Sequence, residues 1–100
     1  MIRNVVVGRI REGVPAEQVE AAIQALRDLT VEGVDFRLVG GQDRGLRDGN
    51  AHYALTADFV SDEAYRIYDD DPEHNRIRRK LFAPISTSIE RIQVSLPDDL

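Results

Sequence analysis

The segment Tyr68-Asp69-Asp70-Asp71-Pro72-Glu73-His74 closes one short helical segment and opens another. Asp71 is a favourable N-cap and Pro72 suits the first position of a helix, so a new helix is expected to begin here. Ser61 is a plausible N-cap for the short helix that precedes it. The segment therefore predicts a helix split at Asp71-Pro72, with His74 in the first turn of its second half.

Four stretches of the chain have the composition and alternation of β-strands. The first, residues 2–10, is rich in valine and isoleucine, and it is apolar on both sides. Val5 and Val7 point to one side of this strand, whereas Val6 and Ile10 point to the other. The remaining predicted strands are residues 34–38, ended by Gly40-Gly41, residues 53–59, and residues 91–96.

Helical spacing of apolar residues defines two helices between these strands. Pro15 suits the start of the first helix, and Pro84 should bend or end the second. The resulting order, β-α-β-β-α-β, predicts an α+β fold of the ferredoxin-like type, with a four-stranded antiparallel sheet and helices on one face. We expect a single domain over residues 1–97 and a short C-terminal tail at residues 98–100.

The second face of such a sheet would be bare in a monomer. Val5, Val7 and Val39 would lie there, and they form a surface too apolar to leave in water. A strand that is apolar on both sides is expected to be covered on both sides. We therefore expect the chain to form a homodimer through this sheet face.

Composition narrows the classes of partner and compartment. The formal net charge of -5 argues against nucleic acid as the main partner, because phosphate binding needs a basic face. No apolar run approaches the roughly 20 residues that span a bilayer, so no membrane association and a cytoplasmic location are expected. The absence of cysteine excludes thiol chemistry. The single basic cluster is interpreted as a solvated face, and it consists of Arg76, Arg78, Arg79 and Lys80.

Taken in order, these segments resemble the stress-responsive A/B barrel (Dabb) domains, a family of dimeric α+β barrels. The opening strand, residues 1–7, is similar to the family's first strand, and Gly13-Val14 with the following helix is similar to its first helix. Phe59, residues 61–68 and residues 71–74 resemble its strand, short helix and proline-histidine turn. The resemblance covers nearly the whole chain.

The resemblance implies a homodimer whose two sheets close into a barrel, with a pocket in each subunit between sheet and helices. Some plant members of the family are polyketide cyclases, which close a ring by an aldol step without cofactor or metal. Their catalytic histidine corresponds to His74, and the tyrosine that orients the substrate corresponds to Tyr68. Where the family often has a pocket-facing histidine on the first strand, this chain has Asn4, which cannot take up a proton at neutral pH.

The same residues can be weighed on their own chemistry. An unperturbed histidine has a pKa of roughly 6.5, so His74 could serve as a base, and its alternative role is structural, in the first helical turn. Tyr68 is either a ligand contact or a packing residue whose hydroxyl reaches water. His52 should face the opposite side of the sheet and is interpreted as structural. Four residues are expected to line a ligand pocket, and they are Asn4, Val6, Phe36 and Tyr53.

The acidic residues around His74 also invite a metal-site interpretation, because hard cations favour clustered carboxylates. Helix capping and complementarity with the helix dipole explain these acids well, so neither a metal nor another cofactor is expected.

Three functions are compatible with these features. The first is a small-molecule-binding dimeric barrel for a small hydrophobic or aromatic ligand, with cofactor-free cyclase-type or lyase-type proton transfer on a carbonyl substrate if it is an enzyme. The second is a non-catalytic stress, stability or interaction protein whose function is its dimer. The third is a cofactor-independent monooxygenase-like barrel, since that related family shares the architecture.

Overall fold

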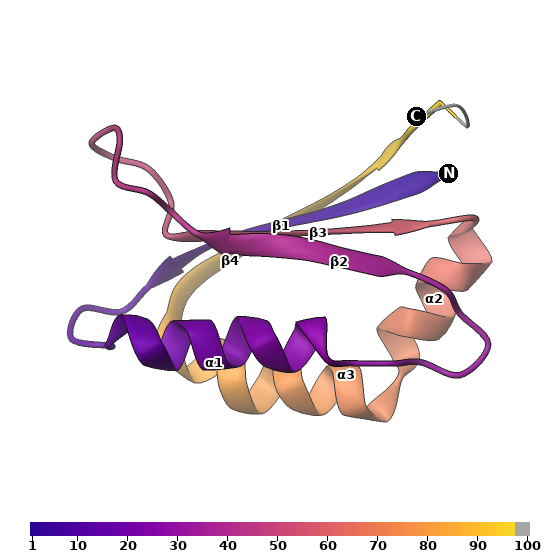
Figure 1. Cartoon of the computed structure of the whole chain (residues 1–100), viewed down its shortest axis with the longest axis horizontal. Helices are drawn as coiled ribbons and strands as arrows, with labels where there is room; N and C mark the ends of the chain where they lie inside the picture. The colour runs from indigo at the N-terminus through magenta and orange to yellow at the C-terminus, as the bar shows by residue number, and fades with distance from the viewer. Residues whose placement is uncertain (98–100) are drawn as a thin grey trace.

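The computed structural model describes residues 1–97, and the tail expected at residues 98–100 lies outside them. Figure 1 shows two layers, a β-sheet and a set of helices packed against one of its faces. The strands are antiparallel and lie in the order β2-β3-β1-β4. The predicted β-α-β-β-α-β order and ferredoxin-like arrangement are confirmed. The elements are β1 (Ile2–Ile10), α1 (Ala16–Arg27), β2 (Arg37–Gln42), β3 (Tyr53–Phe59), α2 (Asp62–Asp70), α3 (Pro72–Ile77), η1 (Arg78–Phe82), η2 (Ala83–Ile85) and β4 (Ser86–Ser95).

The predicted split of the second helix is also confirmed. The Ser61 hydroxyl accepts a hydrogen bond from the backbone N–H of Ala64 (3.1 Å) at the start of α2. A carboxylate oxygen of Asp71 accepts one from the backbone N–H of His74 (2.9 Å) at the start of α3. These caps satisfy backbone donors that a helix start otherwise leaves unpaired. The helical segment then passes through the wider turns of η1 and ends in η2, which contains Pro84.

The bounds of two strands differ from the prediction. Strand β2 begins at Arg37 rather than at residue 34, and it does not end at Gly40-Gly41 but passes through both glycines to Gln42. A Cβ atom on Gly40 would lie 2.3 Å from the backbone oxygen of Ala54, so glycine permits the close pairing of β2 with β3. Strand β4 begins already at Ser86, because its pairing with β1 extends to the far end of that strand.

The core fills the space between the two layers. Strand β1 is a central strand of the sheet, hydrogen-bonded to β3 on one side and to β4 on the other. Its Val6 faces the helices, and the alternate residues of β3 do the same. Phe59 of β3 and Ile23 of α1 are completely buried. No helix within residues 1–97 is long and apolar enough to cross a bilayer.

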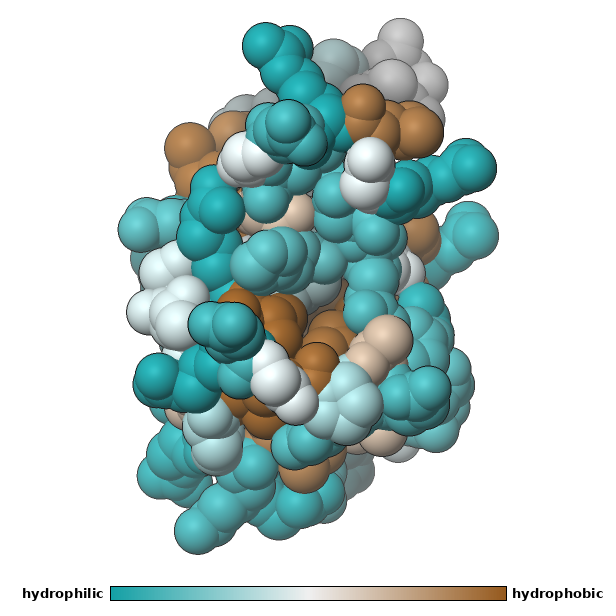
Figure 2. Space-filling view, turned by 90° about the vertical axis from the view of Figure 1, so that its left-hand side faces the viewer, coloured by the Kyte–Doolittle hydropathy of each residue, from teal (hydrophilic) through white to brown (hydrophobic). Residues whose placement is uncertain are grey.

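The sheet face turned away from the helices is apolar, as the sequence predicts. Val39 of β2 is 52% exposed there, and β4 adds Ile92, which pairs with Val5 of β1 and is 59% exposed. A bidentate ion pair between Arg3 and Asp58 (2.8 and 3.0 Å) interrupts this apolar surface. The end of the molecule drawn in Figure 2 is mostly hydrophilic, with a central hollow lined by apolar side chains and further apolar side chains near its upper edges.

Candidate small-molecule pocket

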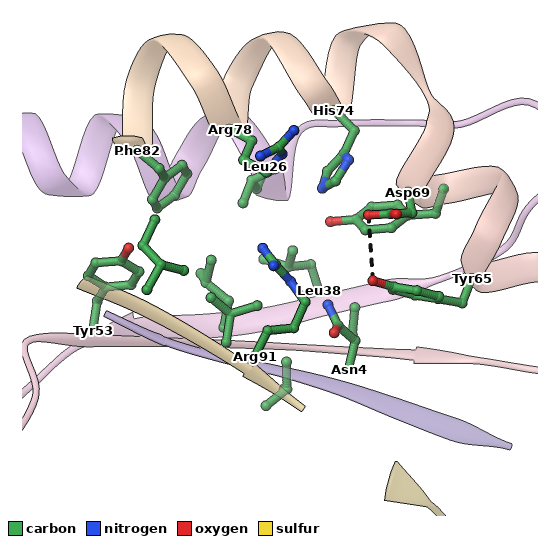
Figure 3. A pocket seen from close by; sticks show the side chains of 16 residues that line it. Asn4, Leu26, Leu38, Tyr53, Tyr65, Asp69, His74, Arg78, Phe82 and Arg91 are labelled. Atoms are coloured by element: carbon green, nitrogen blue, oxygen red, sulfur yellow. Dashed lines mark hydrogen bonds between the residues drawn. The ribbon is translucent and has the colours of Figure 1, made fainter. Parts of the chain in front are cut away.

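A cavity of about 40 Å³ lies between the helix-facing side of the sheet and the split helix. Figure 3 shows side chains that reach into it from both layers. This volume has room for about three water molecules. The lining residues are Asn4, Val6, Leu26, Leu38, Tyr53, Leu55, Thr56, Ala57, Tyr65, Tyr68, Asp69, His74, Arg78, Phe82, Ile89 and Arg91.

His74 enters the cavity from the first turn of α3. The Asp71 cap fixes this turn through the backbone N–H of His74 itself, so the side chain leaves the helix in a defined direction. The imidazole points into the cavity and lies on the Tyr68 ring, with 4.2 Å between ring centroids. Nδ1 is buried and has no hydrogen-bond partner among residues 1–97, so Nε2 is the nitrogen that can meet a ligand.

The surroundings of His74 favour its neutral form. Burial lowers the pKa of the imidazole below its ordinary value of 6.5, because the charged form loses its hydration. The charge of Asp69 opposes this effect, and so does the Asp69 backbone carbonyl, which lies near the ring without completing a hydrogen bond to Nδ1. The charges of Arg78 and Arg91 lower the pKa further. The His74 imidazole is therefore mainly neutral at pH 7.

Tyr68 lies at the end of α2, beneath the His74 ring, and it is buried. Burial is the main cause that raises the pKa of its hydroxyl well above the ordinary range, and the nearby Tyr65 and Asp69 add to it. The hydroxyl is thus a neutral hydrogen-bond donor at any physiological pH. Phe36 and Phe59 hold the Tyr68 ring from behind, at centroid distances of 4.8 and 5.0 Å.

Asn4 approaches the same cavity from the sheet. Its Oδ1 accepts a hydrogen bond from Nε2 of Gln93 (2.7 Å), and its amide nitrogen points toward the cavity in Figure 3. The same Gln93 nitrogen lies 3.4 Å from the Tyr65 hydroxyl, which in turn lies 3.5 Å from a carboxylate oxygen of Asp69. This chain of polar groups holds the Asn4 amide in one orientation and makes its N–H groups available to a ligand oxygen.

The opposite end of the cavity is closed by aromatic rings. Tyr53 and Phe82 lie with centroids 5.5 Å apart, and the Tyr53 hydroxyl is hydrogen-bonded to the Ser86 hydroxyl at 3.0 Å. A Cβ atom on Gly8 would lie 2.1 Å from Cζ of Tyr53, so only glycine at this position lets the ring lie flat over β1. This end of the cavity is therefore walled by tightly packed aromatic rings, and the two hydroxyls there are hydrogen-bonded to each other.

The structure brings together most of the residues that the sequence singles out. Asn4, Val6, Tyr53, Tyr68 and His74 all line one cavity. Phe36, which was also expected to line a ligand pocket, lies outside the lining of this cavity. The Phe36 ring stacks on Phe59 at 5.7 Å and supports Tyr68 instead, because β2 is the outermost strand on that side and starts only after this residue.

His52, the second histidine of the chain, lies away from the cavity. Its Nδ1 accepts a hydrogen bond from the backbone N–H of Ile10 (2.7 Å), which agrees with the structural role expected for it.

Two arginines at the cavity escape the sequence reasoning. Arg78 belongs to the basic cluster interpreted as a solvated face, but it lines the cavity where α3 passes into η1. Arg91 belongs to β4, whose apolar residues Ile92 and Val94 face the open side of the sheet, so Arg91 faces the helices. The first strand is apolar on both sides, which indicates that the open face of the sheet is apolar as well. This signal could have revealed Arg91, because the apolar residues of β4 then belong on the open face and Arg91 on the other.

Comparison with known proteins identifies the family. The family model of the stress-responsive A/B barrel domain matches residues 2–95. The chain belongs to this family. No protein with a curated description matches this stress-responsive A/B barrel domain.

Solved structures agree with this assignment. A dimeric ferredoxin-like protein of unknown function from Thermobifida fusca is 30% identical, with a TM-score of 0.84 over 95% of this chain and 90% of its own. A protein of Arabidopsis thaliana is 20% identical, with a TM-score of 0.80 over 97% and 96% of the two chains. The hydroxynitrile lyase of Passiflora edulis is 16% identical, with a TM-score of 0.74 over 97% and 94%. The last two likenesses concern the fold alone.

The lowered pKa of His74 predicts how the stability of this stress-responsive A/B barrel domain depends on pH. Below about pH 6.5 the unfolded chain binds a proton at this histidine that the folded chain resists, so the free energy of unfolding falls as pH falls toward the folded-state pKa. Urea unfolding of the wild type and of His74→Gln at pH 7.5 and pH 5.0 measures the effect. The wild type should lose more stability than the variant, by about 1.4 kcal/mol for each unit of pKa shift.

Carboxylates titrate in both proteins and cancel in the difference between them. A difference that is independent of pH, or a wild type that gains relative stability in acid, would show that the pKa of His74 is not lowered.

Proposed function

We propose that this stress-responsive A/B barrel domain binds a small carbonyl compound in the cavity and transfers a proton on it without a cofactor. The observation that carries the proposal is the pairing of two neutral groups over one cavity, the His74 imidazole and the Tyr68 hydroxyl, with the Asn4 amide on the opposite wall. A neutral base and neutral donors are what enolisation of a carbonyl compound requires.

The proposed reaction uses each of these groups once. Nε2 of His74 takes a proton from the carbon next to the carbonyl group, and the electrons of the broken C–H bond move to the carbonyl oxygen. The Tyr68 hydroxyl and the Asn4 amide donate hydrogen bonds to that oxygen as its negative charge develops. The imidazolium then returns its proton to the product. Only His74 changes its protonation state, which fits a first strand that carries Asn4 in place of a second titrating group.

The size of the cavity limits the ligand. Binding sites for drug-sized molecules have volumes of about 300 to 1,000 Å³, and this cavity has about 40 Å³. A ligand of more than a few atoms must displace a side chain from the lining. Arg78 and Arg91 are the side chains that can rearrange around such a ligand while still lining the cavity, because both are exposed and neither forms an ion pair within residues 1–97.

Ligand screening tests the proposed binding site. Thermal unfolding is measured for the wild type and His74→Ala with small aromatic acids, β-diketones and acyl thioesters. A ligand at 100 times its dissociation constant stabilises the native state by about 2.7 kcal/mol, which gives a clear rise in the unfolding temperature. The rise should be smaller in His74→Ala, each protein being compared with itself without ligand.

His52→Ala is the matched control, since it removes the other histidine of the chain, which lies outside the cavity lining. It should keep the full ligand-induced rise. A panel in which no compound stabilises the wild type would argue against a small-molecule site. Equal stabilisation of the wild type and His74→Ala would argue against a contact between ligand and His74.

The second candidate function is an interaction module whose dimer is the functional unit, and the apolar sheet face favours it. Val39, Ile92 and Val94 are exposed on that face, and a second copy placed on it would cover them. The dimeric relative from Thermobifida fusca supports this assembly. The two candidates share the homodimer and differ only in whether the cavity is used. The monooxygenase alternative rests on shared architecture, which does not determine function.

Substitution of the exposed sheet residue tests the homodimer. Ile92→Lys places a charge in the centre of the proposed interface, so it should convert a dimer into a monomer in sedimentation equilibrium. Ile67→Lys is the matched control, because Ile67 is also partly exposed but lies on α2, away from the sheet face. A monomeric wild type, or an Ile92→Lys protein that stays dimeric, would contradict the proposed interface.

A further inference from the structure

Two arginines that form no ion pair with a carboxylate of residues 1–97 reach into the cavity from opposite walls. From this arrangement we infer that the cavity takes a small carboxylate anion between Arg78 and Arg91. The substrate of the proposed reaction is then a keto acid rather than a neutral ketone. The choice of substrate rests on the proposed function, whereas the anion site stands on the arginines alone.

The two guanidinium groups come from different layers of the fold. Arg91 extends from β4, where it pairs with Val6 of β1 on the helix-facing side of the sheet. Arg78 extends from the start of η1 in the helical layer. Figure 3 shows both side chains directed into the space between the layers, next to His74. An anion between them would contact the sheet and the helices at once.

The hydrogen-bonding capacity of these arginines is largely unused. Arg91 makes no hydrogen bond and no ion pair with residues 1–97, and Arg78 donates only to Oδ1 of Asn75 (3.1 and 3.4 Å). By contrast, Arg3, Arg27 and Arg76 each form an ion pair with a carboxylate. A guanidinium presents donors in a planar fork that matches the two oxygens of a carboxylate.

The charge balance of the cavity points to a single negative charge. Arg78 and Arg91 contribute two positive charges to the lining, Asp69 contributes one negative charge, and the neutral His74 contributes none. The Asp69 carboxylate lies by the Tyr65 hydroxyl at the other end of the polar chain, and it forms no ion pair with either arginine. Two like charges that share a cavity repel each other, and a monovalent anion between them removes that repulsion.

The arrangement also orients the ligand for the proposed reaction. With its carboxylate between the arginines, a short keto acid directs its remaining atoms either toward His74 and Tyr68 or toward the apolar end. The carbonyl oxygen is better satisfied at the first of these, where the Tyr68 hydroxyl and the Asn4 amide are available, because the Tyr53 and Ser86 hydroxyls at the other end are already hydrogen-bonded to each other. The apolar end, closed by Tyr53 and Phe82, accepts the hydrocarbon part.

A matched pair of probes tests the anion site. Levulinate, a stable keto acid, and methyl levulinate, its neutral ester, are titrated against isotope-labelled protein by NMR at constant ionic strength. Levulinate should bind at least about tenfold more tightly than the ester, since hydrogen bonds between charged groups exceed neutral ones by that order. Arg91→Met and Arg78→Met should each remove most of that preference and leave the affinity for the ester unchanged.

Arg79→Met is the matched control, because Arg79 neighbours Arg78 but does not line the cavity. It should bind both probes as the wild type does. Equal affinity for the acid and the ester, or an acid preference that survives both cavity substitutions, would overturn the anion site. So would a loss of preference in Arg79→Met of the same size, since that would indicate attraction by surface charge in general.

Deuterium uptake separates this inference from the proposed reaction. Exchange of the hydrogens next to the levulinate carbonyl is followed in heavy water with the wild type and His74→Ala. Arginine-dependent binding together with exchange that requires His74 supports both claims. Arginine-dependent binding without such exchange supports the anion site and removes the proton transfer on this keto acid.

Discussion

The structure depends on a first strand that is apolar on both sides and lies in the middle of the sheet. Val6 of β1 faces the helices, while Val5 and Val7 face the open side. The helices can cover only one side, and burial of apolar surface stabilises by about 25 cal/mol per Å² wherever a cover exists. The uncovered side explains why the apolar residues of β4, such as Ile92, lie on the open face of the sheet. The alternate residue Arg91 then lies on the helix-facing side. One constraint thus leads both to the proposed dimer and to a charged group in the pocket.

Within the pocket, burial and charge act together on one residue. Desolvation lowers the pKa of His74, Arg78 and Arg91 lower it further, and Asp69 partly restores it. A histidine held neutral in this way can accept a proton but is a poor donor until it has done so. An anion between the arginines would reduce their effect and raise the pKa of His74. Ligand binding and the basicity of the proposed base are therefore coupled.

Local signals in the sequence predict much of the fold and part of the site. Caps such as Asp71 act through neighbouring backbone groups, so the split helix and the position of His74 follow from a few adjacent residues. The sequence assigned Arg78 to a solvated face, did not single out Arg91 and expected Phe36 in the lining. The surroundings of these residues depend on strand pairing and on which sheet face is open, and local signals do not report either. Alternation alone does not say which set of β4 residues faces the core, and a charged residue on the covered side contradicts the usual pattern. The extension of β2 through Gly40 likewise depends on close contact with β3.

The most direct test of the account is the protonation state of His74 itself. Two-dimensional proton–nitrogen NMR of the imidazole, followed from pH 8 to pH 4.5, reports both the pKa and the nitrogen that carries the proton. The account predicts a pKa below 6.5, with the ring neutral at pH 7. The proposed proton transfer also requires that the proton of the neutral ring is on Nδ1, which leaves Nε2 unprotonated and open to the cavity. A pKa above 6.5, or a neutral ring whose proton is on Nε2, would contradict the role of His74 as the base.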